Sequence, residues 1–343
     1  MPKTAKNLWG DIACFSNLAL AYHRVRKAKR YDSDTIGFYA NLEENLFALE
    51  DALRRRTWRP EPFREFTVTV PKLRLVQAPS FGDRVIHQAV THITAPVFER
   101  RFIYDSYANR VGFGTHLASR RLRSFMRSAS AKWERPYCIK ADIKSYFPSV
   151  NHDTLMTKLR RLFADDGVLW FFDTLVRRSG YTERGLPIGS LTSQWLANLY
   201  LDDLDHYAKD ILGLPYYLRY MDDFVLICPS KAQARETLEK LDSFVLGLHL
   251  RLNPKTAIMP LSKGVDFVGY RHWTSHVLPR KSTVARARRT FKSLRRRFHL
   301  GHVDLDYIRP RVASFTGYMS HCDGHRTLAG ILDKFILSSA APD

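Results

Sequence analysis

Two adjacent aspartates, Asp222 and Asp223, form the most chemically suggestive feature of this chain. They end the tetrad Tyr-Met-Asp-Asp at 220–223, between apolar runs at 214–218 and 224–228. Both runs are short and rich in aromatic and β-branched residues, which predicts the two strands of a hairpin. Carboxylates at a hairpin tip add nothing to packing, but their hard oxygens suit Mg²⁺. An Asp-Asp pair alone is usually a solvated turn, so further residues must decide.

A third aspartate, Asp142, supplies that context because it ends another strand-like run at 137–141. Three carboxylates on two strand ends predict a two-metal phosphoryl-transfer site with Asp142, Asp222 and Asp223 as catalytic residues. The expected cofactor is a pair of Mg²⁺ ions, for which Mn²⁺ can substitute. We also assign Ile143, which follows Asp142, to the metal site.

The composition predicts a polyanionic partner. The 343 residues carry 54 Lys+Arg against 34 Asp+Glu, for a formal charge of +20. Nucleic acid is the first candidate at such a charge. The four cysteines are far apart in the sequence, which argues against a zinc site and favours reduced thiols in a cytoplasmic protein. No run is long enough to span a membrane, so we expect no membrane partner.

Hydrophobic periodicity predicts mixed helices and strands. An apolar face at Tyr39, Leu42, Leu46, Leu49 and Leu53 predicts one continuous helix. Further helices are expected from an N-cap at Asp83, up to about 129, over 152–178, from 194 to about 208, and over about 231–247. Strands are expected within a hairpin at 63–78, at 137–141, beside the tetrad and near 267–270.

The last predicted helix combines a narrow apolar seam with a basic surface. Val284, Ala287, Phe291, Leu294 and Phe298 form the seam, and arginines and a lysine surround it. A solvated face and a membrane-surface helix are alternatives, but we favour contact with a nucleic-acid backbone. The arginines assigned to template and primer are Arg288, Arg289, Arg295 and Arg296.

The tetrad, together with Asp-Ile-Lys-Ser-Tyr-Phe at 142–147, resembles the reverse transcriptase family. The resemblance implies an α+β right-hand polymerase with fingers, an antiparallel palm sheet and a helical thumb. The expected divisions are 1–135 for an N-terminal extension and fingers, 136–275 for the palm, with finger and palm helices inserted at about 152–178, and 276–343 for the basic thumb.

The same resemblance implies roles for further residues. Phe147, five residues after Asp142, would pack under the sugar and exclude a 2′-OH. Residues assigned to dNTP binding are Lys72, Arg74, Phe147, Ile188, Gly189, Gln194 and Lys255. Residues assigned to template and primer, besides the four thumb arginines, are Arg110, Tyr220 and Met221.

One segment narrows the resemblance to a subfamily. Residues 188–194 read Ile-Gly-Ser-Leu-Thr-Ser-Gln, where related enzymes tend to have Gln-Gly and Ser-Pro pairs. This pattern resembles the reverse transcriptases of diversity-generating retroelements, which are bacterial or phage-encoded. It implies copying of a template-repeat RNA into cDNA with misinsertion opposite adenines, and a small basic pentameric accessory protein as partner. An aliphatic Ile188 cannot hydrogen-bond to the nascent pair, which would leave selectivity to shape.

Three alternatives remain at this stage. The first is a retron, intron-derived or antiphage reverse transcriptase without mutagenic copying. The second is a basic RNA-binding scaffold without catalysis, against which all three carboxylates argue. The third is an RNA-dependent RNA polymerase, which Phe147 disfavours.

Overall fold

A computed structural model describes residues 4–27, 29–69, 73–178 and 183–338. The chain divides into two compact units, each assembled from separate stretches of sequence. The first comprises residues 1–110, 142–213 and 240–254, and the second comprises 111–141, 214–239 and 255–343. These units are discontinuous in sequence, unlike the predicted consecutive ranges for fingers, palm and thumb. The division into fingers, palm and thumb stays a prediction.

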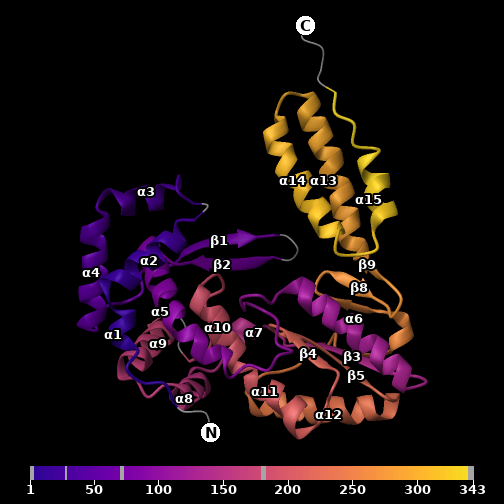
Figure 1. Ribbon diagram of the computed structural model, residues 1–343, viewed down its shortest axis with the longest axis horizontal. Coiled ribbons are helices and arrows are strands. Elements are labelled where there is room, and N and C mark those ends of the chain that lie inside the picture. The colour runs from indigo at the N-terminus through magenta and orange to yellow at the C-terminus, as the bar shows by residue number, and fades with distance from the viewer. Residues whose placement is uncertain (1–3, 28, 70–72, 179–182, 339–343) are drawn as a thin grey trace. The chain divides into compact units, whose positions relative to one another are not determined.

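Runs of helices are interspersed with strands along the chain (Figure 1). The helices are α1 (Trp9–Ile12), α2 (Phe15–Val25), α3 (Ser33–Ala40), α4 (Leu42–Arg54), α5 (Phe81–Glu99), α6 (Thr115–Lys132), α7 (Tyr146–Ser149), α8 (His152–Leu162), α9 (Asp166–Arg178), α10 (Leu191–Tyr200), α11 (Asp202–His206), α12 (Lys231–Gly247), α13 (Lys281–His299), α14 (Leu305–Met319) and α15 (His325–Leu332), with a π-helical turn η1 (Tyr207–Ile211) and a 3₁₀ turn η2 (Leu261–Lys263). The strands are β1 (Arg64–Val68), β2 (Arg74–Ala78), β3 (Tyr137–Asp142), β4 (Tyr217–Tyr220), β5 (Asp223–Cys228), β6 (Ala257–Pro260), β7 (Val265–Phe267), β8 (Tyr270–His272) and β9 (Val277–Pro279).

Helices dominate the first unit. α5 packs against α2 and α10, and α8 packs against α9 and α10. Buried aromatic rings fill the space between these helices, with Phe98, Phe163 and Phe172 in mutual contact. The hairpin β1–β2 pairs antiparallel with Phe66 opposite Val76, and every residue of β1 is exposed. A two-stranded hairpin with so little burial is marginally stable by itself, and the hydrogen bond from the Gln77 backbone N–H to the Ile188 carbonyl ties it to the rest of the unit.

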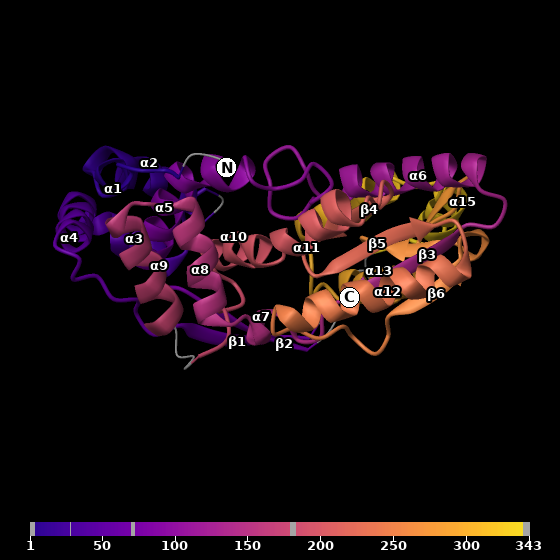
Figure 2. The same ribbon diagram turned by 90° about the horizontal axis from the view of Figure 1, so that it is seen from below.

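The second unit contains two sheets. The larger has the strand order β4-β5-β3-β6, and the pairs β4–β5 and β3–β6 are antiparallel. α6 contacts β4 and β5 and lies along the sheet in Figure 2. Strands β4 and β5 are almost wholly buried, as their continuous apolar sequences require.

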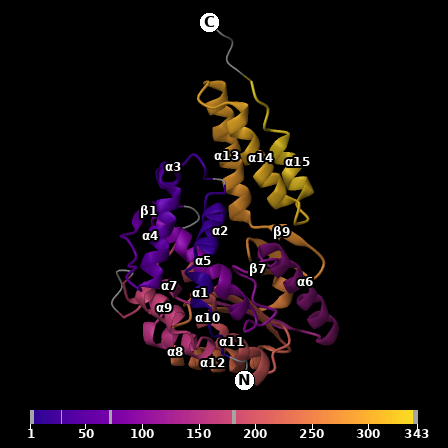
Figure 3. The same cartoon turned by 60° about the vertical axis from the view of Figure 1, so that its left-hand side comes forward.

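The smaller sheet, β7-β8-β9, connects to a helical bundle in the same unit. Tyr270 and Val277 from the sheet pack against Met319 and Cys322 at the end of α14. Helices α13, α14 and α15 lie side by side in Figure 1 and in Figure 3. Their shared core contains Phe291, in ring contact with Phe315 and Phe335.

The structure corrects three expectations about helices. The helix predicted through Tyr39 breaks at Asn41, so Tyr39 belongs to α3 and is exposed, whereas Leu46 and Leu53 on α4 are buried. The helix expected from 194 to about 208 is three consecutive elements, α10, α11 and η1.

The third correction concerns the start of α5, where the N-cap is Ser80 rather than Asp83. The Ser80 hydroxyl accepts a hydrogen bond from the Asp83 backbone N–H. The Asp83 carboxylate instead accepts bonds from Trp58 Nε1 and the Glu61 backbone N–H, both at 2.9 Å. These partners draw the carboxylate into the interior, where burial raises its pKa.

The strand expected near 267–270 is instead the hairpin turn between β7 and β8, where Val268 and Gly269 have positive φ angles. Several other expectations are confirmed. The predicted hairpins and the strand ending at Asp142 are present, and the predicted apolar seam of α13 faces the bundle core. None of the described helices combines the length and apolar character needed to cross a membrane.

Candidate active site

The tetrad 220–223 forms a two-residue hairpin turn. Tyr220 pairs with Asp223 at the ends of β4 and β5, which leaves Met221 and Asp222 as the central residues. Met221 adopts a φ of 58°, in the left-handed region that primed hairpin turns require at their first central residue. A non-glycine side chain there is strained, and such strain is found mainly at functional sites. The turn therefore presents adjacent carboxylates from a constrained backbone.

A buried arginine supports this turn from within the same hairpin. Arg219 on β4 is 0% exposed, and its Nη1 donates a 2.7 Å hydrogen bond to the Met221 carbonyl. Lys140 Nζ on β3 lies 3.5 Å from Asp223 Oδ2, so Asp223 at the start of β5 forms an ion pair with this lysine. Burial raises the pKa of the neighbouring Tyr220 hydroxyl. Tyr220 and Met221 are both half-buried, and their assigned contact with template stays a prediction.

Asp142 is held by a segment more than a hundred residues away in sequence. The Asn253 backbone N–H donates to the Asp142 carbonyl at 2.8 Å, and its side-chain amide lies 3.4 Å from Asp142 Oδ2. Ile143 forms a bridge with Leu252, and its side chain is buried. Because an aliphatic side chain has no donor atom, Ile143 could bind a metal only through its backbone carbonyl.

The two strands that carry candidate metal ligands are neighbours in the larger sheet. β3, which ends at Asp142, is the neighbour of β5, which begins at Asp223. In the part of the chain that the structure describes, no three His, Cys, Asp or Glu side chains gather closely enough to hold a metal. The donor chemistry nevertheless fits Mg²⁺ or Mn²⁺, because all three candidate ligands are carboxylates.

The segment 188–194 is tied to the hairpin β1–β2 of its own unit. The Gln77 backbone N–H on β2 donates a 2.7 Å hydrogen bond to the Ile188 carbonyl. Gly189 has a φ of 123°, and a Cβ there would lie 2.9 Å from Val76 Cγ1 and 3.0 Å from the Gln77 carbonyl oxygen. Glycine is therefore required both by the backbone conformation and by the close approach of β2.

Behind this segment, Ser190 and Thr192 point inward and Ile188 and Gln194 remain half-exposed. The Ser190 hydroxyl is 2.9 Å from His87 Nδ1 and 2.8 Å from the Thr192 hydroxyl. Burial lowers the pKa of His87 to about 4, so the imidazole is neutral at pH 7 and can complete this polar chain.

Phe147 is half-exposed on the short helix α7. Its carbonyl accepts a hydrogen bond from the Leu186 backbone N–H at 2.9 Å, which ties α7 to the segment that leads into 188–194. The preceding Tyr146 is buried, and its hydroxyl donates to the Ala197 carbonyl on α10. The two anchors hold Phe147 with part of its ring accessible, as a sugar-excluding side chain requires.

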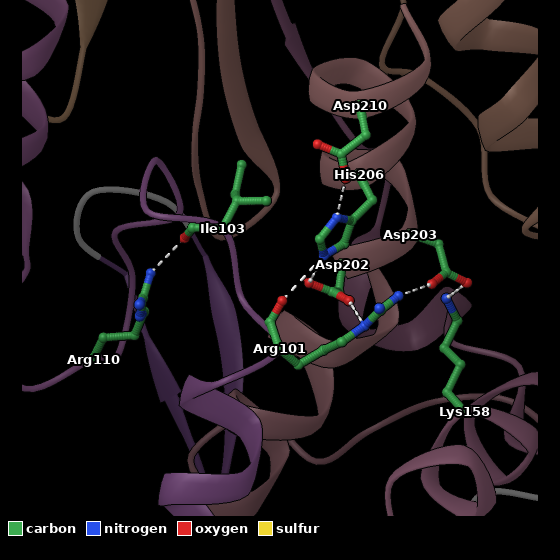
Figure 4. A network of polar contacts seen from close by, with 8 residues as sticks. All are labelled: Arg101, Ile103, Arg110, Lys158, Asp202, Asp203, His206 and Asp210. Atoms are coloured by element: carbon green, nitrogen blue, oxygen red, sulfur yellow. Dashed lines mark hydrogen bonds and ion pairs between the residues drawn. The ribbon is translucent and has the colours of Figure 1, made fainter. Parts of the chain in front are cut away.

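The remaining predicted cationic residues differ in their surroundings. Arg74 and Lys255 are exposed, and Lys72 lies outside the described residues. Arg110 turns inward, because its guanidinium pairs with Glu99 and donates to the carbonyls of Ile103 and Ser106 at 2.7 Å. Figure 4 shows its side chain directed at the Ile103 carbonyl. Its predicted contact with the template would have to compete with these bonds.

The same figure shows an ion-pair network that anchors α11, the helix after α10 (Figure 4). Arg101 lies 2.6 Å from the buried Asp202 and 3.3 Å from Asp203, which also pairs with Lys158 on α8. Burial opposes ionisation of Asp203, but Lys158 and Arg101 together lower its pKa. The network joins the end of α5, α8 and α11 into one scaffold.

On α13, all four thumb arginines predicted to contact nucleic acid are exposed. Three of these arginines, Arg289, Arg295 and Arg296, line a groove of about 560 Å³. Its lining residues are Arg289, Lys292, Ser293, Arg295, Arg296, His299 and Ser338. A groove with this lining suits a phosphate backbone.

Comparison with known families decides the identity of the catalytic domain. The family described as reverse transcriptase (RNA-dependent DNA polymerase) matches residues 67–272, which include every predicted catalytic residue. The chain belongs to the reverse transcriptase family. Residues 67–272 are accordingly the domain of an RNA-directed DNA polymerase.

Individual relatives agree with this assignment. Protein YkfC of Escherichia coli is 28% identical over 278 residues, which cover 68% of this chain and 72% of YkfC. The group II intron-encoded protein LtrA of Lactococcus lactis is 26% identical over 181 residues, 49% of this chain and 29% of LtrA. The chain thus matches less than a third of the longer intron protein.

The fold comparison confirms the predicted architecture. A telomerase structure from Candida tropicalis superimposes with a TM-score of 0.52 at 12% identity, covering 67% of this chain and 58% of the telomerase chain. At that identity the similarity concerns the fold alone. The mixed helices and antiparallel sheets of this reverse transcriptase therefore form the right-hand polymerase fold.

Two residues important to the site were not predicted from sequence. Arg219 immediately precedes the tetrad. The sequence feature that could have revealed its role is its charge within an otherwise apolar strand. Asn253 lies beside the predicted Lys255, but nothing in the local sequence indicates that it binds Asp142.

Proposed function

We propose that this reverse transcriptase copies a template-repeat RNA into cDNA with errors directed to template adenines, as part of a diversity-generating retroelement. The mutated cDNA would then replace a variable region in a target gene. The observation that carries the proposal is Ile188 followed by Gly189 on a segment that β2 holds in place.

Residue 188 would affect how the nascent base pair is checked. The Ile188 carbonyl is bound by Gln77, so its half-exposed side chain cannot easily move away or be replaced by a neighbour. An aliphatic side chain at the pair offers no hydrogen bond whose loss would penalise a mispair. Discrimination by shape alone is weak, of the order of 10- to 200-fold for a methylene-sized difference.

Catalysis would follow two-metal nucleotidyl transfer. Asp142, Asp222 and Asp223 would hold two Mg²⁺ ions, or Mn²⁺, which activate the primer 3′-OH and stabilise charge on the transferred phosphoryl group. Arg74 and Lys255 would contact the triphosphate, and Phe147 would exclude a 2′-OH from the sugar site. The exposed arginines of α13 would hold the template–product backbone without reading its sequence.

A small basic pentameric accessory protein is the proposed partner. The outer fingers and the N-terminal basic cluster (Arg24, Arg26, Lys27, Lys29 and Arg30) are candidate contact surfaces on charge grounds.

The test is sequencing of cDNA made by the purified protein. The reaction contains a structured template RNA, dNTPs and Mg²⁺, with and without a small basic pentameric protein as candidate accessory protein. Errors concentrated at template adenines support the proposal. Ile188→Asn and Ile188→Gln should then lower misincorporation at adenines, whereas the matched control Ile188→Leu should leave the error spectrum unchanged.

A second candidate function is favoured by the relatives. LtrA is a group II intron-encoded protein, so an intron-derived, retron or antiphage reverse transcriptase is the alternative. Faithful cDNA under every condition would support this alternative. In either case the Asp222→Ala/Asp223→Ala double variant should make no cDNA.

A further inference from the structure

We propose that Arg219 is a positioning residue for polymerisation, which fixes the peptide plane between Met221 and Asp222 and thereby orients the two carboxylates of the tetrad. This inference rests on the proposed catalytic role of Asp222 and Asp223. It does not depend on the error spectrum or on the accessory protein.

The burial of Arg219 is the first observation. Its side chain is 0% exposed on β4, where its cross-strand partner Phe224 and its chain neighbour Leu218 are also fully buried. A guanidinium keeps its charge in proteins, and a buried charge is costly unless hydrogen bonds compensate it. A Leu or Met would fill this position at lower cost, so packing alone does not account for an arginine.

The hydrogen bond from Arg219 is the second observation. Its Nη1 donates at 2.7 Å to the carbonyl of Met221, the first central residue of the turn. In a two-residue hairpin turn this carbonyl lies outside the ladder between the strands. Rotation of the Met221–Asp222 peptide plane interconverts type I′ and type II′ turns, which differ in the backbone conformation of the two central residues.

The strain at Met221 makes this bond important. Its φ of 58° is unfavourable for a non-glycine residue, so the turn persists only where its surroundings hold it. A charge-assisted bond from a buried, immobile donor provides such a restraint. Asp222 follows the restrained carbonyl directly, and Asp223 begins β5. The orientation of both carboxylates is therefore set before substrate binds.

The expected consequence is specific to the chemical step. A freely rotating peptide plane would spread the carboxylates over several orientations, which slows phosphoryl transfer and weakens metal binding. The residues assigned to dNTP binding lie outside the turn, so dNTP affinity should not change. Preorganised geometry of this kind acts on kcat rather than on substrate affinity.

Three substitutions separate charge, hydrogen bonding and packing. Arg219→Met removes both charge and donors, Arg219→Gln keeps an amide donor without charge, and Arg219→Lys keeps the charge with a shorter reach. Single-turnover primer extension gives the maximal rate and the apparent dNTP affinity, and a Mg²⁺ titration gives the half-saturating concentration. Thermal unfolding and circular dichroism verify that each variant is folded.

We expect Arg219→Met to lower the maximal rate by about 10- to 100-fold, the rate equivalent of one lost charge-assisted hydrogen bond. The half-saturating Mg²⁺ concentration should rise, and dNTP affinity should stay within about twofold, within ordinary assay variation. Arg219→Gln and Arg219→Lys should recover part of the rate. Arg219→Met and Met221→Gly should also be non-additive, because both act on the same turn.

The matched control is Val265→Ala, a buried position on β7 of the same unit that lies outside the hairpin. It should reduce stability without changing the Mg²⁺ requirement. The proposal is overturned if folded Arg219 variants lose stability as this control does but retain the wild-type rate and Mg²⁺ requirement. Full activity of Asp222→Asn would instead refute the catalytic assignment of the tetrad itself.

Discussion

Replacing Gly189 with alanine should damage both stability and nucleotide use. At a φ of 123° the backbone of Gly189 is strained for any other residue, at a cost of about 1–3 kcal/mol. The new Cβ would also lie 2.9 Å from Val76 Cγ1 and 3.0 Å from the Gln77 carbonyl oxygen. Such overpacking adds about 1–3 kcal/mol. Val76 is β-branched and Gln77 contributes backbone, so neither can yield cheaply.

The structure offers a close control for the backbone part of this cost. Gly114 has a φ of 121°, and an added Cβ there would meet nothing within 4 Å. Gly114→Ala should therefore carry the conformational strain without the collision. The difference between the two variants, about 1–3 kcal/mol, measures the contact between Gly189 and β2.

The functional effect should follow from displacement of β2. Once the two segments separate, the hydrogen bond from Gln77 to the Ile188 carbonyl is lost, and the exposed Arg74 on the same strand moves with it. If the same energy is lost from the transition state, kcat/KM for dNTP should fall by about 5- to 150-fold. Steady-state primer extension with one dNTP varied measures this, and amide hydrogen exchange reports loosening of β2.

The prediction is refuted by a specific result. Equal destabilisation of Gly189→Ala and Gly114→Ala, with wild-type kcat/KM in both, would show that the approach of β2 does not constrain residues 188–194.

Two further predictions concern pH and salt. Burial lowers the pKa of His87 and His272 to about 4, so only the unfolded chain takes up their protons between pH 6.5 and 4. The free energy of unfolding should be at its full value above about pH 6.5. It should decrease as the pH is lowered, by about 2 kcal/mol per histidine at pH 5. Urea unfolding at about pH 6.5 and pH 5 should show a smaller loss of unfolding free energy in His87→Gln than in the wild type. Equal losses would contradict the lowered pKa of His87. For the thumb, Arg295→Gln/Arg296→Gln should weaken duplex binding equally for all sequences and reduce the slope of log affinity against log salt by about two. An unchanged slope in a fluorescence-anisotropy titration would remove these arginines from the backbone contact.

Local sequence patterns determined much of this protein. The strands around the tetrad, the strand ending at Asp142 and the seam of α13 were predicted because each pattern depends on residues close together in the chain. The family's catalytic motif was recognisable for the same reason. The helices α14 and α15, and the break at Asn41, were not predicted.

Only the tertiary structure decided which partners complete the site. Asp83 and Ser80 are both good N-caps by residue type, but Trp58 and Glu61, which lie 25 and 22 residues away, bind the Asp83 carboxylate. Asn253 reaches Asp142 across 111 residues. Arg219 is an ordinary charged residue in sequence and becomes a buried donor to the Met221 carbonyl only when the chain has folded around β4. Propensity is a property of neighbouring residues, whereas burial and long-range hydrogen bonds exist only once distant segments have packed together.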